Sequence, residues 1–227
     1  MKAKPTVIIY PGGAYSHLSP RESEPVARAF KAMGCATDIL RYTVRETLDR
    51  PPLGLTPVRQ LSERVARARE AGGPVVVCGF SAGGHLAASL GVHWRKLGLC
   101  KPDAMILCYP VITADERYCN AESILNIAAE GEREFFSLEA QVTADTPPAF
   151  LWHTAADDSV PVENSLMFAS ALSRYGIPFE LHVYPFGAHG LSLATEEVAQ
   201  PEKGRLPDAH VAGWVRECEA WLDQILR

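Results

Sequence analysis

The stretch Val75-Val-Val-Cys-Gly-Phe-Ser-Ala-Gly-Gly-His85 decides the fold of this chain. It opens with an apolar run that predicts a buried strand, and a helical pattern follows. Between the two lies Gly79-Phe-Ser-Ala-Gly83, a G-x-S-x-G turn that raises a serine hydroxyl at the tip of a parallel strand. Glycine at both ends lets the turn form without a Cβ clash, and the N-terminus of the next helix points at the reacting oxygen. Ser81 is therefore the candidate nucleophile.

Strand and helix patterns alternate on both sides of this turn. Strands are expected at Thr6–Tyr10, Thr37–Arg41, Val75–Cys78, Ala104–Tyr109, Ala149–His153 and Phe179–Tyr184. The alternation predicts an α/β fold, a mostly parallel doubly wound sheet of about six strands with helices on both faces. The last strand alternates apolar and polar residues, so we expect it at or near an edge of the sheet.

Helix start and stop residues fit the gaps between these strands. In Ser19-Pro-Arg-Glu22 we expect an N-cap, a proline at the first helical position and a capping-box glutamate, with the helix running to Met33. Further helices are expected from Thr56 to Gly72, after Ser81, over residues 162–175 and over residues 211–225. Residues 113–147 do not follow this rhythm, and we expect them to form a small lid.

Size and composition narrow the function. A chain of 227 residues with 47% hydrophobic content can bury one substantial core, so residues 1–227 are expected to form a single domain. The formal net charge is −5, and no basic stripe or cationic amphipathic helix suggests nucleic acid or a membrane surface as partner. Met1-Lys-Ala-Lys-Pro5 lacks the apolar segment of a signal peptide. We therefore expect a cytoplasmic protein whose six cysteines are reduced thiols.

A serine hydroxyl needs a base to remove its proton, and the base needs an acid to orient it. In this architecture the partners follow in the order Ser, then Asp or Glu, then His. Asp157 and Asp158 come just after one expected strand, and His189 lies in a loop after the next. These positions place an acid and a base at the carboxyl edge of the sheet, beside Ser81. Adjacent residues point in different directions, so only one of the two aspartates can face His189.

His189 is the favoured base among seven histidines. Its neighbours Ala188 and Gly190 leave the imidazole free to approach Ser81. His85 is expected to be structural, while His17, near the first loop, is a candidate to line the site. The remaining four fall inside expected strands or helices, where packing or solvation is the default reading: His93, His153, His182 and His210.

The transition state of acyl transfer develops an oxyanion, which needs backbone N–H donors already in place. One donor is expected at Ala82, the residue after the nucleophile. Others are expected at Gly13 and Ala14, in the loop Tyr10-Pro-Gly-Gly-Ala-Tyr-Ser16 that follows the first strand. The alternative is a simple glycine-rich turn, but lipases and esterases carry an H-G-G motif at this place.

These motifs resemble the α/β-hydrolase superfamily, and more narrowly the small bacterial acetyl-esterase or carbohydrate-esterase-like group, which includes xylanase-associated esterases. The matching pieces span nearly the whole chain in the family's order: Tyr10-Pro-Gly-Gly-Ala-Tyr15, Leu40-Arg-Tyr42, Gly79 through Leu86, Pro147-Pro148, His153 through Pro161 and Gly187-Ala-His-Gly190. In that family two residues separate the acid from a Val-Pro pair. The resemblance therefore implies Asp157 as the acid, ahead of Val160-Pro161.

The resemblance also implies hydrolysis of short-chain, mainly acetyl, esters of sugars or small alcohols through a Ser-His-Asp acyl-enzyme, with no metal or organic cofactor. A small-molecule ester is the expected partner. Tyr15 and His17 near the first loop, and Phe135 and Phe136 in the lid, are candidates to contact it. For the two phenylalanines, plain packing is the alternative. Two other functions share this scaffold: a serine peptidase of the prolyl-oligopeptidase type and a non-catalytic ligand-binding module.

Two departures from the family pattern matter. Pro11 stands where many relatives carry the histidine of H-G-G, which removes an imidazole but no backbone donor. The chain also starts almost at the strand that is usually third, so we expect a fold trimmed by two N-terminal strands. A sheet edge exposed in this way needs cover, and a homodimer is one way to supply it. A 25 kDa monomer at micromolar concentration by light scattering would count against the dimer.

Overall fold

The computed structural model describes residues 4–47 and 52–226 and is built on a six-stranded sheet. The strand order is β2-β1-β3-β4-β5-β6, and every neighbouring pair is parallel. The strands are β1 Thr6–Tyr10, β2 Ala36–Ile39, β3 Val75–Phe80, β4 Ala104–Cys108, β5 Ala149–Thr154 and β6 Phe179–Tyr184. The predicted α/β fold is confirmed, and β6 lies at an edge as its alternating pattern predicted.

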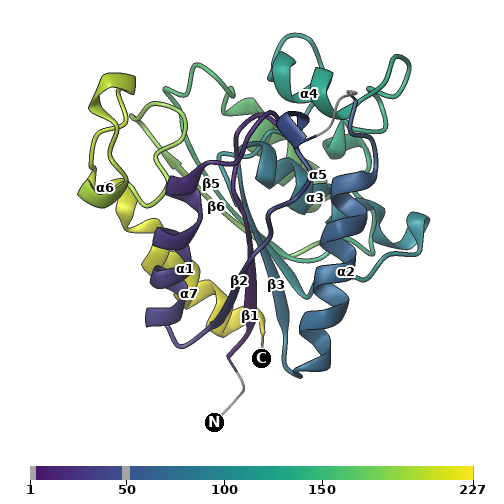
Figure 1. Cartoon of the computed structure of the whole chain (residues 1–227), viewed down its shortest axis with the longest axis horizontal. Helices are drawn as coiled ribbons and strands as arrows, with labels where there is room; N and C mark the ends of the chain where they lie inside the picture. Colours follow the sequence, from purple (N-terminus) through teal and green to yellow (C-terminus); the bar gives the residue numbers. More distant parts are fainter. Residues whose placement is uncertain (1–3, 48–51, 227) are drawn as a thin grey trace.

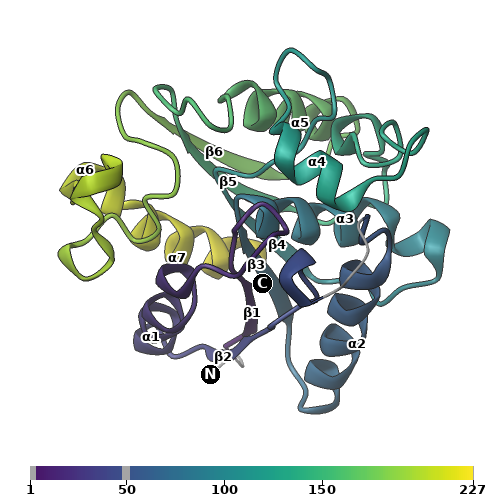
Figure 2. The same ribbon diagram turned by 45° about the horizontal axis from the view of Figure 1, so that its top comes forward.

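Helices cover both faces of this sheet (Figures 1 and 2). One face packs against α2 Thr56–Glu70, α3 Ala82–Leu97 and α5 Glu163–Arg174; the other packs against α1 Glu24–Ala32 and α7 Trp214–Ile225, with the short α6 Ala209–Ala212 beside it. Alternate residues of β3 serve the two cores: Val75 and Val77 join the first, and Val76 and Cys78 join the second. The central strands are therefore apolar throughout because both of their faces are buried.

The segment before α1 corrects one sequence prediction. The expected helix from Ser19 to Met33 is two pieces, a 3-10 turn η1 Pro20–Glu22 and then α1. Ser19 makes no side-chain cap, and Glu22 turns inward, where only 3% of it is exposed. The capping-box prediction for Glu22 is therefore wrong. Its carboxylate instead accepts from two buried donors, the Gly12 N–H and the Tyr109 hydroxyl.

The expected lid, residues 113–147, contains α4 Ala121–Ile127 and a 3-10 turn η3 Leu138–Ala140. Figure 1 shows α4 at the top of the molecule, the end toward which the strands run. The other irregular stretch, residues 190–207, carries the 3-10 turns η4 Glu196–Val198 and η5 Pro201–Lys203. A further 3-10 turn, η2 Arg45–Thr47, follows β2. Loops at the carboxyl ends of parallel strands are where α/β folds place ligands.

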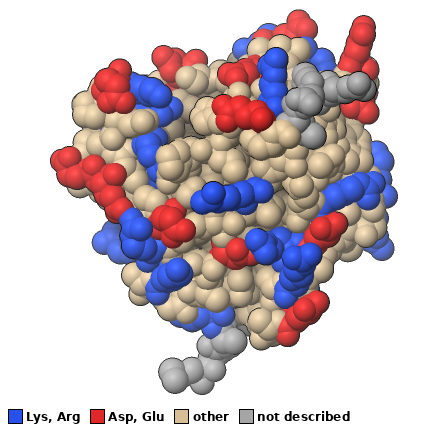
Figure 3. Space-filling view, in the orientation of Figure 1, with Lys and Arg blue, Asp and Glu red and all other residues tan. Residues whose placement is uncertain are grey.

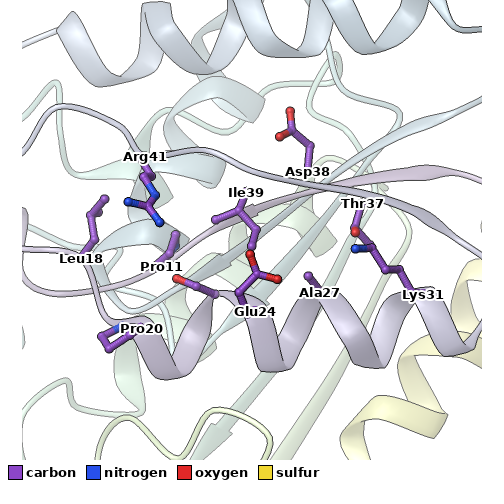
Figure 4. Close-up of a pocket in the computed structure, with 11 residues that line it drawn as sticks. Pro11, Leu18, Pro20, Glu24, Ala27, Lys31, Thr37, Asp38, Ile39 and Arg41 are labelled. Carbon is purple, nitrogen blue, oxygen red and sulfur yellow. The ribbon is translucent and has the colours of Figure 1, made fainter.

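The edge at β2 has a hollow beside it. A cavity of about 510 Å³ lies between α1 and β2, and the charged side chains of Glu24, Lys31 and Arg41 are among those that line it (Figure 4). None of the candidate catalytic residues lines it. Acidic and basic side chains are also interspersed over the face of the molecule in Figure 3. The dimer expected from an exposed edge stays a prediction.

Two expectations concern location and redox state. Within residues 4–47 and 52–226, none of the helices is both long and apolar enough to cross a membrane. The reading of the N-terminal segment falls partly on residues 1–3, which lie outside the described residues, and the cytoplasmic location stays a prediction. All six cysteines are free thiols.

Candidate active site

Ser81 occupies a strained turn between β3 and α3. Its φ is 54° and its ψ is −119°, a backbone conformation that is costly for any residue with a Cβ. The flanking glycines make the turn possible. A Cβ on Gly79 would lie 2.1 Å from the Gly83 carbonyl oxygen, and one on Gly83 would lie 2.1 Å from the Tyr10 carbonyl oxygen. The sequence pattern thus raises the Ser81 hydroxyl to the edge of the sheet, as expected for a nucleophile turn.

The structure brings Ser81, His189 and Asp157 into one hydrogen-bonded chain. The Ser81 hydroxyl donates to Nε2 of His189 at 2.8 Å, and Nδ1–H of His189 donates to Oδ2 of Asp157 at 2.7 Å. Asp158 is exposed, and within the described residues its carboxylate accepts only from the Ser159 hydroxyl, at 3.3 Å. Of the two adjacent aspartates, Asp157 therefore faces the imidazole. This is the arrangement of nucleophile, base and orienting acid that the chemistry requires.

Asp157 is buried yet suited to carry a negative charge. Burial alone would raise its pKa, but hydrogen bonds from His153 and His189 and from the Val160 N–H bring the pKa well below its usual range. Oδ1 accepts the N–H groups of Ser159 and Val160 at 3.0 and 2.9 Å. The carboxylate is thus held ionised and in one orientation.

His153 is a neighbour of this acid that the sequence analysis missed. Its Nε2 lies 2.9 Å from the Val160 carbonyl oxygen and 3.3 Å from Oδ2 of Asp157, and both of these atoms are acceptors. Nε2 must therefore carry the hydrogen, while Nδ1 accepts from the Ser165 hydroxyl at 2.8 Å. The sequence holds a sign of this contact, because His153 is the last residue of the expected strand Ala149–His153, four residues before Asp157.

The loop after β1 lies where oxyanion donors were expected. Gly13, Ala14 and Tyr15 have φ values of 128°, 53° and 60°, so the chain makes a tight left-handed turn beside Ser81. Among the described residues, the N–H groups of Gly13, Ala14 and Ala82 have no hydrogen-bond acceptor. Gly13 and Ala14 line the same cleft as Ser81. These free donors fit the role of an oxyanion hole.

Three side chains from other elements hold this loop, and the sequence analysis found none of these contacts. Glu22 Oε2 accepts the Gly12 N–H at 2.7 Å, and Asn126 in α4 donates from Nδ2 to the Ala14 carbonyl at 2.9 Å. The Tyr42 hydroxyl also donates to the Pro11 carbonyl, at 2.6 Å. The loop is therefore fixed before, within and after its glycines.

The cleft around Ser81 has a volume of about 260 Å³ and is mainly polar. His17 lines it, as expected from its place near the first loop. The full set of lining residues is Gly13, Ala14, His17, Ser19, Arg21, Glu22, Ser81, Asn120, Glu122, Ser159, His189, Gly190, Lys203 and Arg205.

The structure does not bring Tyr15, Phe135 or Phe136 into this cleft. Tyr15 is fully buried, and its hydroxyl donates to Nδ1 of His85 at 2.8 Å. Phe135 stacks on His93 with ring centroids 3.9 Å apart, and Phe136 is 3% exposed. Packing, the alternative for the phenylalanines, accounts for both. The expected contact of Tyr15 with substrate is therefore corrected, because its side chain packs against Tyr42 and His85.

His85 is structural, in line with the sequence reading. Nε2–H donates to the Phe136 carbonyl at 3.0 Å, and Nδ1 accepts from Tyr15. Burial lowers the pKa of His85 to about 4, so its imidazole is neutral at pH 7. The described residues include no group of three or more His, Cys, Asp or Glu side chains arranged to hold a metal ion. The expected absence of a cofactor stays a prediction.

Comparison with known proteins places this geometry in a family. A family model describing the alpha/beta hydrolase fold matches residues 7–193, so the chain belongs to that family. Among solved structures, the acetyl ester-xyloside bifunctional hydrolase of Caldicellulosiruptor lactoaceticus is 34% identical with a TM-score of 0.84, covering 99% of this chain and 84% of that one. A carboxylesterase of Lactobacillus plantarum WCFS1 is 27% identical with a TM-score of 0.86, covering 100% and 88%.

Curated relatives agree. An acetylxylan esterase of Xylanibacter ruminicola is 30% identical over 207 residues, which are 83% of this chain and 41% of that protein. Endo-1,4-beta-xylanase B of Butyrivibrio fibrisolvens is 37% identical over 211 residues, which are 84% of this chain and 33% of that protein. The chain thus spans between a third and about two fifths of the length of these two relatives.

Proposed function

We propose that this chain is a carboxylic ester hydrolase that cleaves short-chain, mainly acetyl, esters through a Ser-His-Asp acyl-enzyme. The hydrogen-bonded chain from Ser81 through His189 to Asp157, with contacts of 2.8 and 2.7 Å, is the observation that carries the proposal. Relatives named acetylxylan esterase and carboxylesterase support it.

In this mechanism Ser81 Oγ attacks the ester carbonyl while Nε2 of His189 takes the hydroxyl proton. Asp157 stabilises the imidazolium without taking a proton itself. The N–H groups of Gly13, Ala14 and Ala82 receive the developing oxyanion. His189 then protonates the leaving alcohol, and a water activated by the same imidazole releases the acid from Ser81. Each such oxyanion donor typically contributes roughly 10²–10³ in rate.

The cleft supports a small acyl group and a hydroxylated alcohol. Its volume of about 260 Å³ leaves little room for a long acyl chain beside the alcohol. Side chains able to hydrogen-bond, such as Asn120, Ser159 and Glu122, line it where the alcohol would lie against α4 and the loop after β5. We propose a sugar acetate as the class of substrate.

The test is hydrolysis of p-nitrophenyl esters from acetate to octanoate by the parent and by Ser81→Ala, with acetylated xylo-oligosaccharides as the sugar substrate. We expect acetate to be cleaved fastest, Ser81→Ala to lose about 10⁴-fold or more in kcat, and acetate to be released from the sugar. A parent inactive on every ester would overturn the proposal, whether or not a fluorophosphonate labels Ser81. Fastest cleavage of octanoate would overturn the short-chain specificity.

A further inference from the structure

Glu22 is a buried carboxylate beside the nucleophile that the triad does not use. It is 3% exposed, comes from the turn η1 and lines the Ser81 cleft. Oε2 accepts the Gly12 N–H at 2.7 Å, and Oε1 accepts the Tyr109 hydroxyl at 2.6 Å. Both partners donate, so each carboxylate oxygen has one donor. Burying a carboxylate costs free energy unless hydrogen bonds compensate for the lost water. A residue that only filled space would not need this charge, so the placement of Glu22 calls for another explanation.

The bond to Gly12 bears directly on the oxyanion donors. The Gly12 carbonyl accepts the Ser19 N–H at 2.9 Å, so both polar groups of Gly12 are engaged. In a trans peptide the N–H of the next residue points opposite to the carbonyl. Fixing the Gly12 carbonyl toward Ser19 therefore aims the Gly13 N–H the other way.

The carboxylate also leaves this segment little freedom to shift. A Cβ on Gly12 would lie 2.7 Å from the Phe80 carbonyl oxygen and 2.9 Å from both Glu22 Oε2 and the Cβ of Ser81. Gly12 is thus enclosed between the end of β3, the nucleophile and Glu22. Movement of Glu22 would open one side of this enclosure.

The bond to Tyr109 ties the same carboxylate to the histidine side of the site. The Tyr109 hydroxyl accepts the Ser192 N–H at 2.9 Å, three residues after His189. The Tyr109 ring also packs edge-on against the His189 ring, with centroids 5.1 Å apart. Glu22 therefore links the loop of the oxyanion donors to the loop of the base.

We propose that Glu22 is a positioning residue of the oxyanion hole: it holds the Gly12 N–H and the Tyr109 hydroxyl, and so keeps the Gly13 and Ala14 N–H groups in place relative to Ser81 and His189. The inference rests on the proposed function, because that function gives these N–H groups their role. Glu22 acts through the backbone of its neighbours and does not itself touch the reacting carbonyl.

The test compares Glu22→Ala, Glu22→Gln and the control Glu24→Ala, an exposed residue of the same segment. Functional sites are counted by titration, so that kcat is expressed per folded site. For Glu22→Ala we expect kcat on p-nitrophenyl acetate to fall roughly 10- to 100-fold, because the donors are displaced rather than removed, with KM changed less than about 3-fold. Glu24→Ala should match the parent.

Glu22→Gln separates the hydrogen bond from the charge. Its amide oxygen can still accept the Gly12 N–H, and its NH2 can donate to the Tyr109 hydroxyl, so we expect a loss of less than about 5-fold. A kcat for Glu22→Ala within about 2-fold of the parent, per folded site, would overturn the proposal. Equal losses in the Ala and Gln variants would overturn it too, since they would assign the effect to charge.

A second measurement keeps this test independent of the substrate. Phosphonylation of Ser81 by a fluorophosphonate builds charge on an oxygen in the same hole, so its rate constant should fall for Glu22→Ala in parallel with kcat. If the parent reacts with the fluorophosphonate but cleaves no ester, the proposed function fails while the rate ratio still decides the role of Glu22. An unchanged labelling rate would overturn that role.

Discussion

Asp157 and Glu22 are two buried carboxylates near the candidate nucleophile, 6% and 3% exposed. Asp157 faces two imidazoles and two backbone N–H groups. Glu22 accepts one backbone N–H and one tyrosine hydroxyl. In the proposed mechanism the first orients the group that moves the proton, and the second orients the backbone that receives the charge. Both carboxylates are almost fully buried, so burial does not distinguish their proposed roles. The difference lies in the hydrogen-bond donors that each one holds.

The largest effect is expected on the histidine side. In Asp157→Asn the amide can present its NH2 to Nδ1 of His189, which favours the tautomer that cannot accept the Ser81 proton. We expect kcat/KM on p-nitrophenyl acetate to fall by roughly 10⁴-fold. The matched control is Asp158→Asn, which should retain parental activity because Asp158 is exposed and does not contact the imidazole. The reverse pattern would move the acid to Asp158.

A smaller effect is expected on the oxyanion side, where Asn126 is another side chain that holds the loop. Asn126→Ala removes the bond from Nδ2 to the Ala14 carbonyl, and we expect kcat to fall about 10-fold with little change in KM. Leu125→Ala is the control, because Leu125 is the preceding residue of α4 and is 68% exposed.

The double variant that combines Asn126→Ala with Glu22→Ala tests whether these two residues act on the same loop. Glu22 and Asn126 hold the same loop, so the double variant should lose less than the product of the two single losses. Asn126 and Asp157 act on different groups, so their effects should come closer to multiplying. Multiplicative losses for Glu22 with Asn126 would argue that the two act separately.

His153 offers a milder perturbation of Asp157. His153→Gln removes an N–H that lies near both the Val160 carbonyl and Oδ2 of Asp157, while three other donors remain on the carboxylate. We expect kcat/KM to fall about 3- to 10-fold and the free energy of unfolding to fall by about 1–3 kcal/mol, because buried partners lose a donor. Urea unfolding and kinetics on the same preparation measure both. A loss as large as that of Asp157→Asn would make His153 equal in importance to the acid.

The two carboxylates also differ in how far the sequence predicts them. Asp157 could be predicted together with Ser81 and His189, because each of the three follows an expected strand. Parallel strands bring the loops at their carboxyl ends to one edge of the sheet. Glu22 lies in Ser19-Pro-Arg-Glu22, which is typical of a helix cap, and only contacts with Gly12 and with Tyr109, 87 positions away, reveal its actual partners. Tertiary contacts outweighed a local preference worth about 1 kcal/mol.

The substrate residues show the same limit. His17 was placed by its proximity to the glycine loop and lines the cleft. Phe135 and Phe136 were named for their size and position in an irregular stretch, yet the rings pack on His93 and against the core near His85. The local sequence does not show which way an apolar side chain in an irregular insertion faces. For a residue that follows a strand, the end of the strand indicates where in the fold it lies.

Among these predictions, substitution of His85 is expected to change activity at pH 7 the least. His85 is a buried base, and its effect should appear in how the free energy of unfolding depends on pH. Burial lowers the pKa of His85 to about 4, and no acidic group opposes that shift. The unfolded chain therefore takes up a proton near pH 6.5 that the folded protein refuses, so stability is full above pH 6.5 and declines as the pH falls toward 4. The decline expected from His85 alone is about 3 kcal/mol.

The contribution of Asp157 to stability depends on pH in a different range. Its pKa lies below the unfolded value of about 3.9, so its contribution is lost only as the pH falls below that value. Urea unfolding at pH 7, 5.5 and 4.5 should therefore show the decline due to histidine before that due to the acid. His85→Gln should flatten this decline by roughly half, since His93 has a similarly lowered pKa of about 4, and the exposed His210→Gln should leave it unchanged. If the free energy of unfolding of His85→Gln declined as steeply with falling pH as that of the parent, the prediction would be wrong. Such a result would mean that the buried imidazole of His85 is already charged in the folded protein, and that burial alone does not keep it neutral.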